Sequence, residues 1–380
     1  MKKNKRIKIL FTGGGTAGHI LPIIAVAREL RKLNFEANFS YIGPKDSFAS
    51  LLLSQEGIKV RRIIAGKIRR YFGIKSIFQN VIDILFKMPF SFLQAFFYIL
   101  FLNPDIVFSK GGYGSFSTVF WSWIFQVPVF LHESDVIPGL ANKIMGNFAM
   151  EIFVSFSVSQ TEFFSKKKMI SVGNPVRTEI MEGSEEEAKK IFNLSCEKPV
   201  ILILGGSQGA QKINDLILAI LPEALDKYEL IHQCGEKHFK NVSAESKVVI
   251  KEGMENYYHL FSFFIEEELK HAYKVADLVV SRAGSGSIFE IAATENPAIL
   301  IPLPNAAQGH QLKNAYKYVE EGGALVIEES NLTSHFFLER MNYLFSRPDK
   351  MRDMQTSAIR FSRPKAAKVI AQYLKDYLRQ

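Results

Sequence analysis

Residues 7–22 read IKILFTGGGTAGHILP, in which a short apolar run stops in glycines and passes into residues with helical spacing. Such a strand–glycine–helix junction opens doubly wound α/β folds. Further β-rich runs up to residue 172 are ANFSYIG (37–43), DIVFSKGG (105–112), VPVFLHES (127–134) and EIFVSF (151–156). The later ones are PVILILGG (199–206), LIHQCG (230–235), SKVVIKE (246–252), LVVSRAG (278–284), AILIPLP (298–304) and ALVIEE (324–329).

These two series predict an α/β protein with two doubly wound, Rossmann-like domains, each a parallel sheet covered on both faces. A length of 380 residues fits two domains. The stretch VGNPVR (172–177) is the expected link, since Gly173 and Pro175 punctuate the chain there. We therefore predict domains at 1–172 and 173–354, and a C-terminal helix over 355–380 that packs back on the N-terminal domain.

The composition is that of a globular chain, with 47% hydrophobic and 22% charged residues and only two cysteines. It argues against a disordered chain and against a disulfide framework. Charge is uneven: residues 1–172 hold 22 Lys and Arg against 10 Asp and Glu, a net charge of +12, while the remainder has a net charge of −3. The front half is therefore the part expected to meet an anionic partner. The apolar run Ile9–Phe11 is too short for a signal peptide.

The first glycine loop formally matches G-x-G-x-x-G at Gly13, Gly15 and Gly18. A dinucleotide site would also need an acidic residue closing the second strand, but that strand ends in Gly43–Pro44, with Asp46 beyond it. A phosphate or sugar site, or simply a tight turn, remains. His19 falls in the first helical turn, where the positive helix end disfavours its protonated form. It is a candidate general base or a structural histidine.

Other strands also end in small or polar residues. GGYGS (111–115) with Lys110 beside it would suit a diphosphate. In GGSQGAQKIND (205–215), Ser207 and the backbone amides of 206–209 can cradle a phosphate without the Walker lysine. HESDVIPGLANK (132–143) offers acid–base groups in His132, Glu133 and Asp135, or a capped helix start with Asp135 as N-cap.

The second half carries two further candidate segments. In SRAGSGSIFE (281–290), Glu290 lies one turn into the helix that follows the strand. A carboxylate at this place can accept hydrogen bonds from both ribose hydroxyls of a nucleotide. The alternative is an exposed helical glutamate without a binding role. In PLPNAAQGHQLKNA (302–315), an amide-rich cluster suits sugar hydroxyls, although a solvated loop would look similar. That cluster consists of Gln308, His310 and Gln311.

Taken in order, these segments resemble the MurG family of peptidoglycan N-acetylglucosaminyltransferases over roughly residues 7–330. The segments that carry the resemblance are GGGTAGH with Pro22, KGGYGS, HESDVIPGLANK, GNPVR, GGSQGA, FIEEELKHAYKVADLVVSRAGSGSIFEIA and GHQLKNA. The resemblance implies a GT-B fold with the site in the cleft between two domains. It also implies transfer of N-acetylglucosamine from UDP-N-acetylglucosamine to the 4-hydroxyl of an undecaprenyl-pyrophosphoryl-muramoyl-pentapeptide.

Residue roles follow from the resemblance as well. His19 would be the general base of an inverting displacement, with Glu133 as a second candidate. The donor-binding residues would be Thr16, Ala17, Gly18, Asp135, Arg177, Ser207, Ile265, Ser285, Gly286, Ser287, Glu290, His310 and Gln311. The acceptor's pyrophosphate would be held by Gly13, Gly14, Gly15, Gly111, Gly112, Tyr113 and Gly114. No cofactor is implied, because UDP-N-acetylglucosamine is a substrate, and the sequence shows no Asp-x-Asp pair placed for a nucleotide-bound metal.

More finely, the backbone of Ile265 would contact uracil, Glu290 the ribose, and Ser207 with 285–287 the diphosphate. The sequence departs from the family at two positions. Ala17 replaces a glycine of the first loop, which we expect to leave the turn intact. Asp135 stands where the family usually has asparagine, and a carboxylate cannot donate as an amide does.

A basic cluster precedes an apolar, aromatic stretch in the front half. Its members are Lys59, Arg61, Arg62, Lys67, Arg69, Arg70 and Lys75, and the aromatic residues after them are Phe72, Phe78, Phe86, Phe90, Phe92, Phe96, Phe97 and Phe101. We expect a helix over 88–104 with one face buried and one face on lipid, rather than a membrane span. The predicted partner is an anionic membrane surface on the cytoplasmic side, bound peripherally through the N-terminal domain, and not nucleic acid.

Rival interpretations remain at this stage. A related GT-B glycosyltransferase acting on another lipid would share the fold and the UDP site. A UDP-sugar epimerase of the same fold would need no membrane surface. A non-catalytic membrane-binding homologue is the third alternative.

Overall fold

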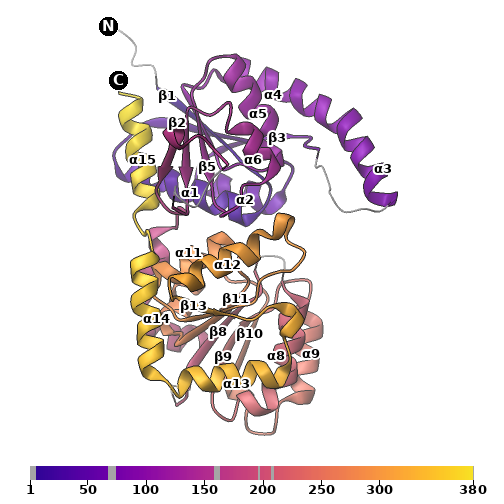
Figure 1. Cartoon of the computed structure of the whole chain (residues 1–380), viewed down its shortest axis with the longest axis vertical. Coiled ribbons are helices and arrows are strands. Elements are labelled where there is room, and N and C mark those ends of the chain that lie inside the picture. The colour runs from indigo at the N-terminus through magenta and orange to yellow at the C-terminus, as the bar shows by residue number, and fades with distance from the viewer. Residues whose placement is uncertain (1–5, 67–73, 158–162, 196, 207–208, 380) are drawn as a thin grey trace. The chain divides into compact units, whose positions relative to one another are not determined.

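The computed structural model describes residues 6–66, 74–157, 163–195, 197–206 and 209–379, and the chain forms two compact units (Figure 1). The first unit comprises residues 1–177 and 365–380, and the second comprises residues 178–364. These divisions fall later than the predicted 172/173 and 354/355. Val172 and Gly173 still donate to the carbonyl of Val154 in the first unit, and the helix that begins at Pro348 continues to Phe361.

The described part of the first unit contains one parallel sheet of seven strands in the order β3-β2-β1-β4-β5-β6-β7. Each of the central strands is a short run of buried apolar residues, as a sheet covered on both faces requires. The strands are β1 (Ile7–Thr12), β2 (Ala37–Pro44), β3 (Lys59–Ile63), β4 (Ile106–Ser109), β5 (Val129–Glu133), β6 (Glu151–Val154) and β7 (Met169–Ser171).

Alternate strand residues build two cores, one on each face of this sheet. On one face, Phe11, Phe108 and Phe130 pack with helices α1, α2 and α15. On the other, Leu10, Val107 and Leu131 pack with α4, α5 and α6. The helices are α1 (Ala17–Lys32), α2 (Ser47–Gln55), α3 (Ile74–Ile82), α4 (Met88–Leu102), α5 (Phe116–Ile124), α6 (Leu140–Met145) and α15 (Ala366–Tyr377).

Across its described residues the second unit has a six-stranded parallel sheet in the order β10-β9-β8-β11-β12-β13. Its strands are β8 (Val200–Leu204), β9 (Glu229–Gln233), β10 (Tyr258–Phe261), β11 (Leu278–Ser281), β12 (Ala298–Leu300) and β13 (Ala324–Val326). Its helices are α7 (Glu185–Phe192), α8 (Gln211–Ala224), α9 (Phe239–Val249), α10 (Glu266–Val275), α11 (Ser285–Ala293), α12 (His310–Glu320), α13 (Ser334–Phe345) and α14 (Pro348–Phe361).

The strand predicted at residues 246–252 is not present in the structure. Residues 246–249 end α9, in which Val242 and Ser246 are buried one turn apart while Val248 is 84% exposed. The strand at that edge of the sheet is β10, about ten residues further along. The edge strands β3 and β7 were not predicted either, because β3 reads KVRRI and β7 has only three residues.

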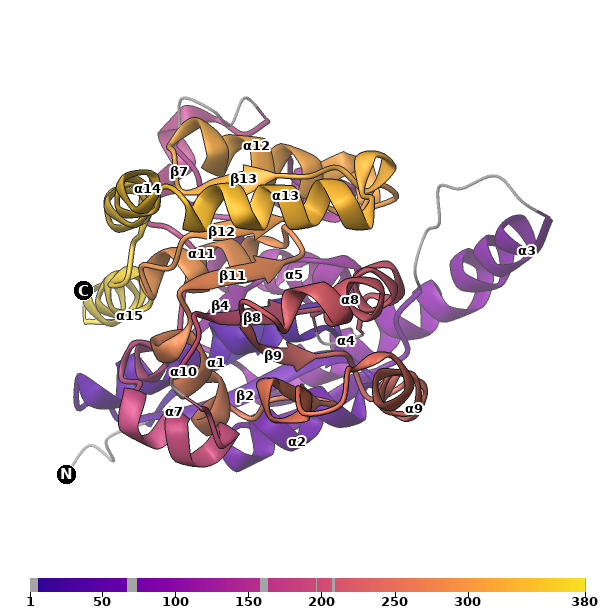
Figure 2. The ribbon, with the colours of Figure 1, turned by 90° about the horizontal axis from the view of Figure 1, so that it is seen from below.

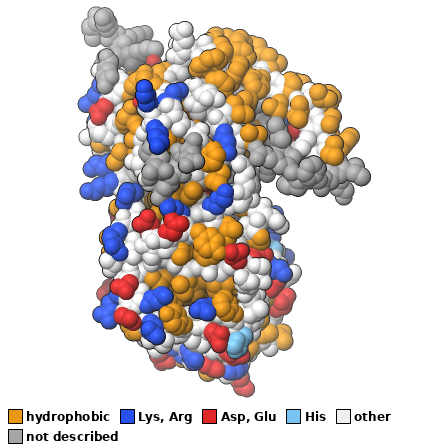
Figure 3. Space-filling model, viewed as in Figure 1, with side chains coloured by type: hydrophobic (Ala, Val, Ile, Leu, Met, Phe, Trp, Pro, Cys, Tyr) orange, Lys and Arg blue, Asp and Glu red, His pale blue; other side chains and the backbone are white. Residues whose placement is uncertain are grey.

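The predicted apolar helix is part of a longer helical arm, which we define as residues 76–102. By length and composition alone this segment could cross a membrane, and 17% of its most apolar window is buried. In both ribbon views α3 extends away from the sheet of its own unit, and the space-filling view shows hydrophobic side chains along it (Figures 1, 2 and 3). The α4 half packs on the unit through Ser91, Ala95 and Ile99, and Asp83 just before it is also buried.

Candidate active site

Two glycine loops of the first unit meet at the carboxyl edge of its sheet. One follows β1 and the other follows β4, and these strands are neighbours in the sheet order. The chain leaves β1 toward β2 on one side and returns to β4 on the other, so the loops flank the switch point at which doubly wound sheets bind ligands. The backbone N–H of Lys110 donates to the carbonyl of Thr12 at 2.8 Å and fixes the two strand ends together.

The His19 imidazole lies against both glycine loops. A Cβ on Gly14 would lie 2.9 Å from the ring atoms Cε1 and Nδ1, and a Cβ on Gly112 would lie 3.0 Å from Nε2. Gly112 also has a φ of +85°, which favours glycine. His19 Nδ1 is 2.9 Å from the Thr16 hydroxyl. Gly14 of the first loop and Gly112 of the second loop are thus brought together beside one imidazole.

Helix α1 begins at Ala17, with Thr16 as the N-cap residue. The alanine that replaces the family's glycine therefore occupies an ordinary helical position, and the expectation that the turn survives is confirmed. A Cβ on Gly18 would meet nothing within 4 Å, so this first turn leaves open space beside it.

Glu133 is buried at the end of β5, and both of its carboxylate oxygens are engaged. Oε1 accepts from the backbone N–H of Asp135 at 2.9 Å, and Oε2 accepts from the Asn142 amide at 2.7 Å. Asn142 Oδ1 in turn accepts from the N–H of Gly112 at 3.0 Å. Glu133 therefore links the HESD turn to the second glycine loop. Asp135 is not a helix N-cap, since α6 begins at Leu140 after Gly139.

Charge is concentrated beneath these loops. Lys110 is 2% exposed and donates to the Ser134 hydroxyl. Burial raises the pKa of Glu133, and the neighbouring Asp135 carboxylate raises it further. Burial lowers the pKa of Lys110, against the opposing influence of Glu133 and Asp135. Lys110 and Asp135 are thus near enough to interact electrostatically.

His19 is uncharged at neutral pH. Burial, and to a smaller extent the nearby Lys110 ammonium, lowers the pKa of His19 from 6.5 to about 4. A neutral imidazole whose Nδ1–H donates to the Thr16 hydroxyl has an unprotonated Nε2 beside Gly112. That arrangement can accept a proton from a hydroxyl held at the two glycine loops. His132, by contrast, is a buried residue whose Nε2 lies 3.0 Å from the carbonyl of Gly173.

The second unit has a corresponding switch point between β8 and β11. The loop after β11 leads into α11, whose first turn is Ser285–Gly286–Ser287, and its N-terminal amides point toward this edge. Gly206 and Gly209, in the loop after β8, have φ values of +79° and +75°. Ser207 lies outside the described residues. An N-terminal helical turn facing a glycine loop can bind a diphosphate.

Glu290 lies on α11, one turn beyond those amides, and the Tyr273 hydroxyl is 3.5 Å from its Oε2. Gln311 Oε1 accepts from the N–H of Leu303 at 2.9 Å and fixes the loop before α12. His310 is the first residue of α12, directly after Gly309 with a φ of +65°.

For two predicted donor-binding residues, Ile265 and Arg177, the structure gives their surroundings but does not test their roles. The backbone N–H of Ile265, predicted to contact uracil, donates to Glu268 Oε2 at 3.1 Å, and its carbonyl accepts from Leu269. Arg177 is buried at the last position of the first unit's long segment. Their roles toward the donor stay predictions.

Two residues without a predicted role, Asn142 and Tyr41, shape the site. The Tyr41 hydroxyl donates to the carbonyls of Gly13 and Gly14 at 3.1 and 3.3 Å. No local pattern marks either residue, because each acts on a loop far away in the chain. Among the described residues, no three His, Cys, Asp or Glu side chains gather as a metal site would need.

Comparison with known proteins places this architecture in a family. The glycosyltransferase family 28 N-terminal domain matches residues 9–154, and the C-terminal domain of the same family matches residues 200–370. A UDP-N-acetylglucosamine–N-acetylmuramyl-(pentapeptide) pyrophosphoryl-undecaprenol N-acetylglucosamine transferase of Clostridium tetani is 38% identical over 355 residues, covering 93% of this chain and 94% of the relative. The chain belongs to the MurG family. A Bacillus cereus member of the MurG family is 37% identical over 97% of this chain and 99% of its own.

Solved structures share the fold. Acinetobacter baumannii MurG superposes with a TM-score of 0.72 at 22% identity, covering 97% of this chain and 99% of its own. A UDP-GlcNAc 2-epimerase of Neisseria meningitidis, solved bound to UDP-GlcNAc, superposes with a TM-score of 0.67 at 15% identity, covering 97% of this chain and all of its own. The predicted GT-B fold of two Rossmann-like units is confirmed.

Proposed function

We propose that this chain transfers N-acetylglucosamine from UDP-N-acetylglucosamine to N-acetylmuramyl-(pentapeptide) pyrophosphoryl-undecaprenol. The observation that carries the proposal is its identity of 37–38% over nearly the full length of relatives named for that reaction. The loops of the first unit are where the acceptor would bind, and those of the second unit are where UDP would bind. UDP-N-acetylglucosamine is a substrate, and the proposal needs no cofactor.

In the first unit, His19 acts as the general base. The acceptor's 4-hydroxyl gives its proton to Nε2 while its oxygen attacks the anomeric carbon of the donor. The bond from that carbon to the UDP oxygen breaks, and the configuration inverts. Glu133 is the weaker candidate, because each of its oxygens already accepts a hydrogen bond. It is a positioning residue that holds the second glycine loop through Asn142.

In the second unit, the first turn of α11 supplies amides for the diphosphate and stabilises the charge of the departing UDP. Glu290, one turn further along the same helix, accepts hydrogen bonds from the ribose hydroxyls. Gln311 contacts the transferred sugar through its Nε2, since its Oε1 is held by Leu303. Ser207, Arg177 and His310 complete the proposed donor set.

The helical arm docks on the membrane that holds the acceptor. Its aromatic residues divide into two groups. Phe92 and Phe96 pack on α5, with ring centroids 5.8 Å from Phe116 and 4.9 Å from Trp121. The outward group has exposed fractions from 44 to 78% and consists of Phe78, Phe86, Phe90, Phe97 and Phe101. An arm with one face on the protein and one face apolar suits the bilayer surface.

We infer peripheral docking rather than a span from how the arm is held. Ser91, Ala95 and Ile99 fix the α4 half along the unit, so this half cannot enter a bilayer alone. In the middle of the arm Asp83 pairs with Lys87 at 2.5 Å, and a charged pair there opposes insertion. The basic residues Arg61 and Arg62 precede the arm, whereas Lys67, Arg69 and Arg70 lie outside the described residues.

The test is a transfer assay with radiolabelled UDP-N-acetylglucosamine and the lipid acceptor in detergent, followed by counting of the lipid fraction. We expect label in the lipid, and a loss of about 10²–10⁴-fold in kcat for His19→Ala. Glu133→Gln should cost less, because glutamine keeps the acceptor for the N–H of Asp135. A larger loss for Glu133→Gln than for His19→Ala would move the base to Glu133. Donor binding without transfer would redirect the search to another lipid acceptor.

A further inference from the structure

Lys110 is a buried cation at the candidate active site to which the proposed mechanism gives no task. It lies in the loop directly after β4 and reaches the ends of two neighbouring strands. A Cβ on Gly13 would lie 3.5 Å from the Lys110 Cβ, and the Lys110 backbone N–H donates to Thr12. Its ammonium donates to the Ser134 hydroxyl after β5. A buried ammonium is costly unless nearby charges compensate it, so its surroundings indicate its role.

Two carboxylates lie within electrostatic reach of the Lys110 ammonium. Its hydrogen-bond partner Ser134 stands between Glu133 and Asp135 in the chain, and both acids favour the charged form of the lysine. Glu133 is the more deeply buried of the two, at the end of β5. An ionised carboxylate in such a place is costly without a neighbouring cation.

The hydrogen bonds of Glu133 require its ionised form. Oε1 accepts from the backbone N–H of Asp135 at 2.9 Å, and Oε2 accepts from the Asn142 amide at 2.7 Å. A carboxylate accepts at both oxygens, whereas a carboxylic acid carries a proton on one of them, where it would face an N–H. Protonation therefore breaks one of these bonds. A proton on Oε2 would release Asn142, whose Oδ1 accepts from the N–H of Gly112 at 3.0 Å.

Lys110 is the cation that faces the Glu133 carboxylate. Helix α6 contributes the uncharged Asn142 amide, and β6 places Val154 opposite Glu133 in the sheet register. Burial and the Asp135 carboxylate raise the pKa of Glu133, whereas its two hydrogen bonds and the Lys110 ammonium lower it. The charge of Lys110 thus opposes protonation of the group that links the HESD turn to the second glycine loop.

Two buried histidines are further ionisable neighbours of Lys110. Burial lowers the pKa of His19 and of His132, and the Lys110 ammonium contributes a smaller part of the effect in each. Both imidazoles are neutral at neutral pH, so neither compensates the charge of the lysine. The compensation comes from Glu133 and Asp135.

We propose that Lys110 is a positioning residue that keeps the Glu133 carboxylate ionised and thereby holds the second glycine loop beside His19. The inference rests on the proposed function, because it takes His19 as the base of that reaction. Glu133 holds Asn142, and Asn142 holds Gly112. A Cβ on Gly112 would lie 3.0 Å from Nε2 of the imidazole, so this loop forms the wall beside the proton-accepting atom.

The test is the pH profile of kcat for lipid glycosylation in Lys110→Met, because methionine nearly keeps the length of the side chain and removes its charge. Without the cation Glu133 takes up its proton at a higher pH, so the acidic limb should move upward by about one to two pH units. We expect kcat about tenfold below the wild type at pH 7 and within about threefold of it at pH 9, where the carboxylate is ionised in both proteins. This recovery also shows that the variant folds.

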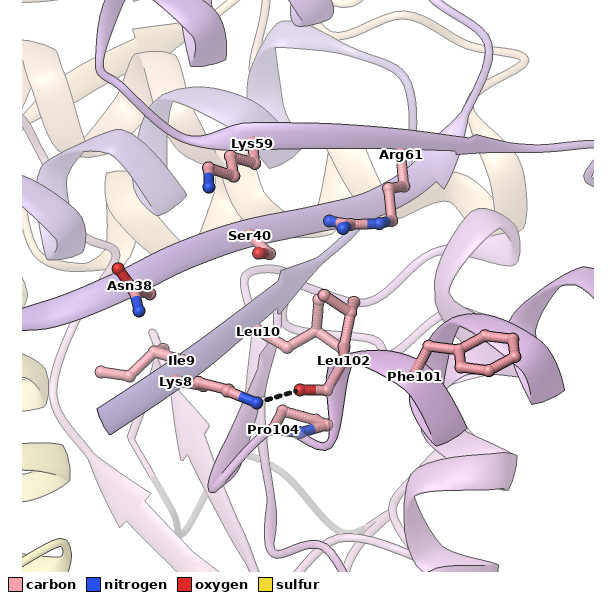
Figure 4. Close-up of a pocket in the computed structure, with 10 residues that line it drawn as sticks. All are labelled: Lys8, Ile9, Leu10, Asn38, Ser40, Lys59, Arg61, Phe101, Leu102 and Pro104. Atoms are coloured by element: carbon pink, nitrogen blue, oxygen red, sulfur yellow. Dashed lines mark hydrogen bonds between the residues drawn. The ribbon is translucent and has the colours of Figure 1, made fainter. Parts of the chain in front are cut away.

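Two comparisons show whether the effect passes through Glu133. In a Glu133→Gln background, Lys110→Met should change kcat by less than about threefold at any pH, since no carboxylate is left to titrate. Lys8→Met is the matched control. Lys8 lines a pocket of about 180 Å³ at the amino edge of the same sheet, where its Nζ donates to the carbonyl of Leu102 at 2.9 Å (Figure 4). It lies five residues before Gly13, roughly 16 Å away at about 3.3 Å per residue, and its loss should leave the profile unchanged.

Two outcomes of the kinetic test would overturn the proposal. A displaced limb that persists in the Glu133→Gln background would assign the effect to the titration of His19. Equal losses of kcat at pH 7 and pH 9 would make Lys110 a packing residue without an electrostatic role.

A second readout needs no substrate. The pKa of Glu133 is raised on folding, so its contribution to stability is present below its ordinary pKa and is lost as the pH rises through the raised one. In Lys110→Met this loss extends to higher pH. The Tm should therefore fall further between pH 6 and pH 8.5 in Lys110→Met than in the wild type, and this difference should shrink in the Glu133→Gln background. Equal falls would overturn the role of Lys110, whereas a wild type without transfer activity would overturn only the proposed function.

Discussion

Substituting Gly14 by alanine tests whether the first glycine loop positions His19. The added Cβ would lie 2.9 Å from two atoms of the imidazole, whereas ordinary contacts lie at 3.4–4 Å. The ring must therefore move by about 0.5–1 Å. Gly14 is not among the positive-φ residues, so alanine brings no left-handed strain. A misplacement of about 1 Å can cost about 10²-fold in rate, equivalent to about 2.7 kcal/mol of transition-state stabilisation.

The assay is kcat for lipid glycosylation, measured in a double-mutant cycle with His19→Ala. If Gly14→Ala acts through the imidazole, it should lower kcat about 10²-fold in the wild type and add little in the His19→Ala background. Gly139→Ala is the matched control, because its Cβ would meet nothing within 4 Å, and it should leave kcat unchanged. Equal losses in both backgrounds would refute the positioning role and assign Gly14 to direct acceptor binding.

Three further predictions follow from the structure. The pKa of His19 is about 4 in the folded protein, below the ordinary 6.5, so the fold favours the neutral imidazole. The contribution of this imidazole to the free energy of unfolding is therefore fully present above pH 6.5 and is lost as the pH falls toward 4. The fall in Tm of the first unit from pH 7.5 to 5 should therefore be smaller in His19→Gln, and equal falls would contradict this. Glu290→Gln should weaken UDP binding about 10–100-fold in calorimetry, as expected for loss of a charged hydrogen-bond acceptor, and unchanged affinity would remove Glu290 from the donor site. Leu374→Ala, at a fully buried position of α15, should destabilise the first unit by about 2–5 kcal/mol in urea, whereas Val369→Ala at a 47% exposed position should not.

The sequence predicted the strands that are continuous and buried, because such runs have one physical interpretation in a parallel sheet. It failed where amphipathic segments admit two interpretations. Residues 246–252 are rich in β-branched side chains, yet burial there follows a helical period. In β3, Lys59 and Arg61 share one face and alternate with residues of the other face. This stretch was therefore predicted only as part of a basic cluster and not as a strand.

The candidate site was predictable as a set of loops but not as a geometry. The sequence shows that glycine loops follow β1 and β4. It does not show that these two strands are neighbours, because that depends on the order of the strands in the sheet. The placement of His19 against Gly112 and the link from Glu133 through Asn142 depend on that adjacency. Long-range contacts of this kind leave no local pattern.

The first unit is discontinuous in the chain, and this has a consequence for biosynthesis. Helix α15 contributes Ile370, Ala371 and Leu374 to the core around α1, yet the ribosome makes it only after the whole of residues 178–364. The second unit is contiguous and can fold as soon as it emerges. The first unit must wait with an unfinished apolar face beside its exposed arm. The nascent chain thus completes its second unit before the core of its first unit closes.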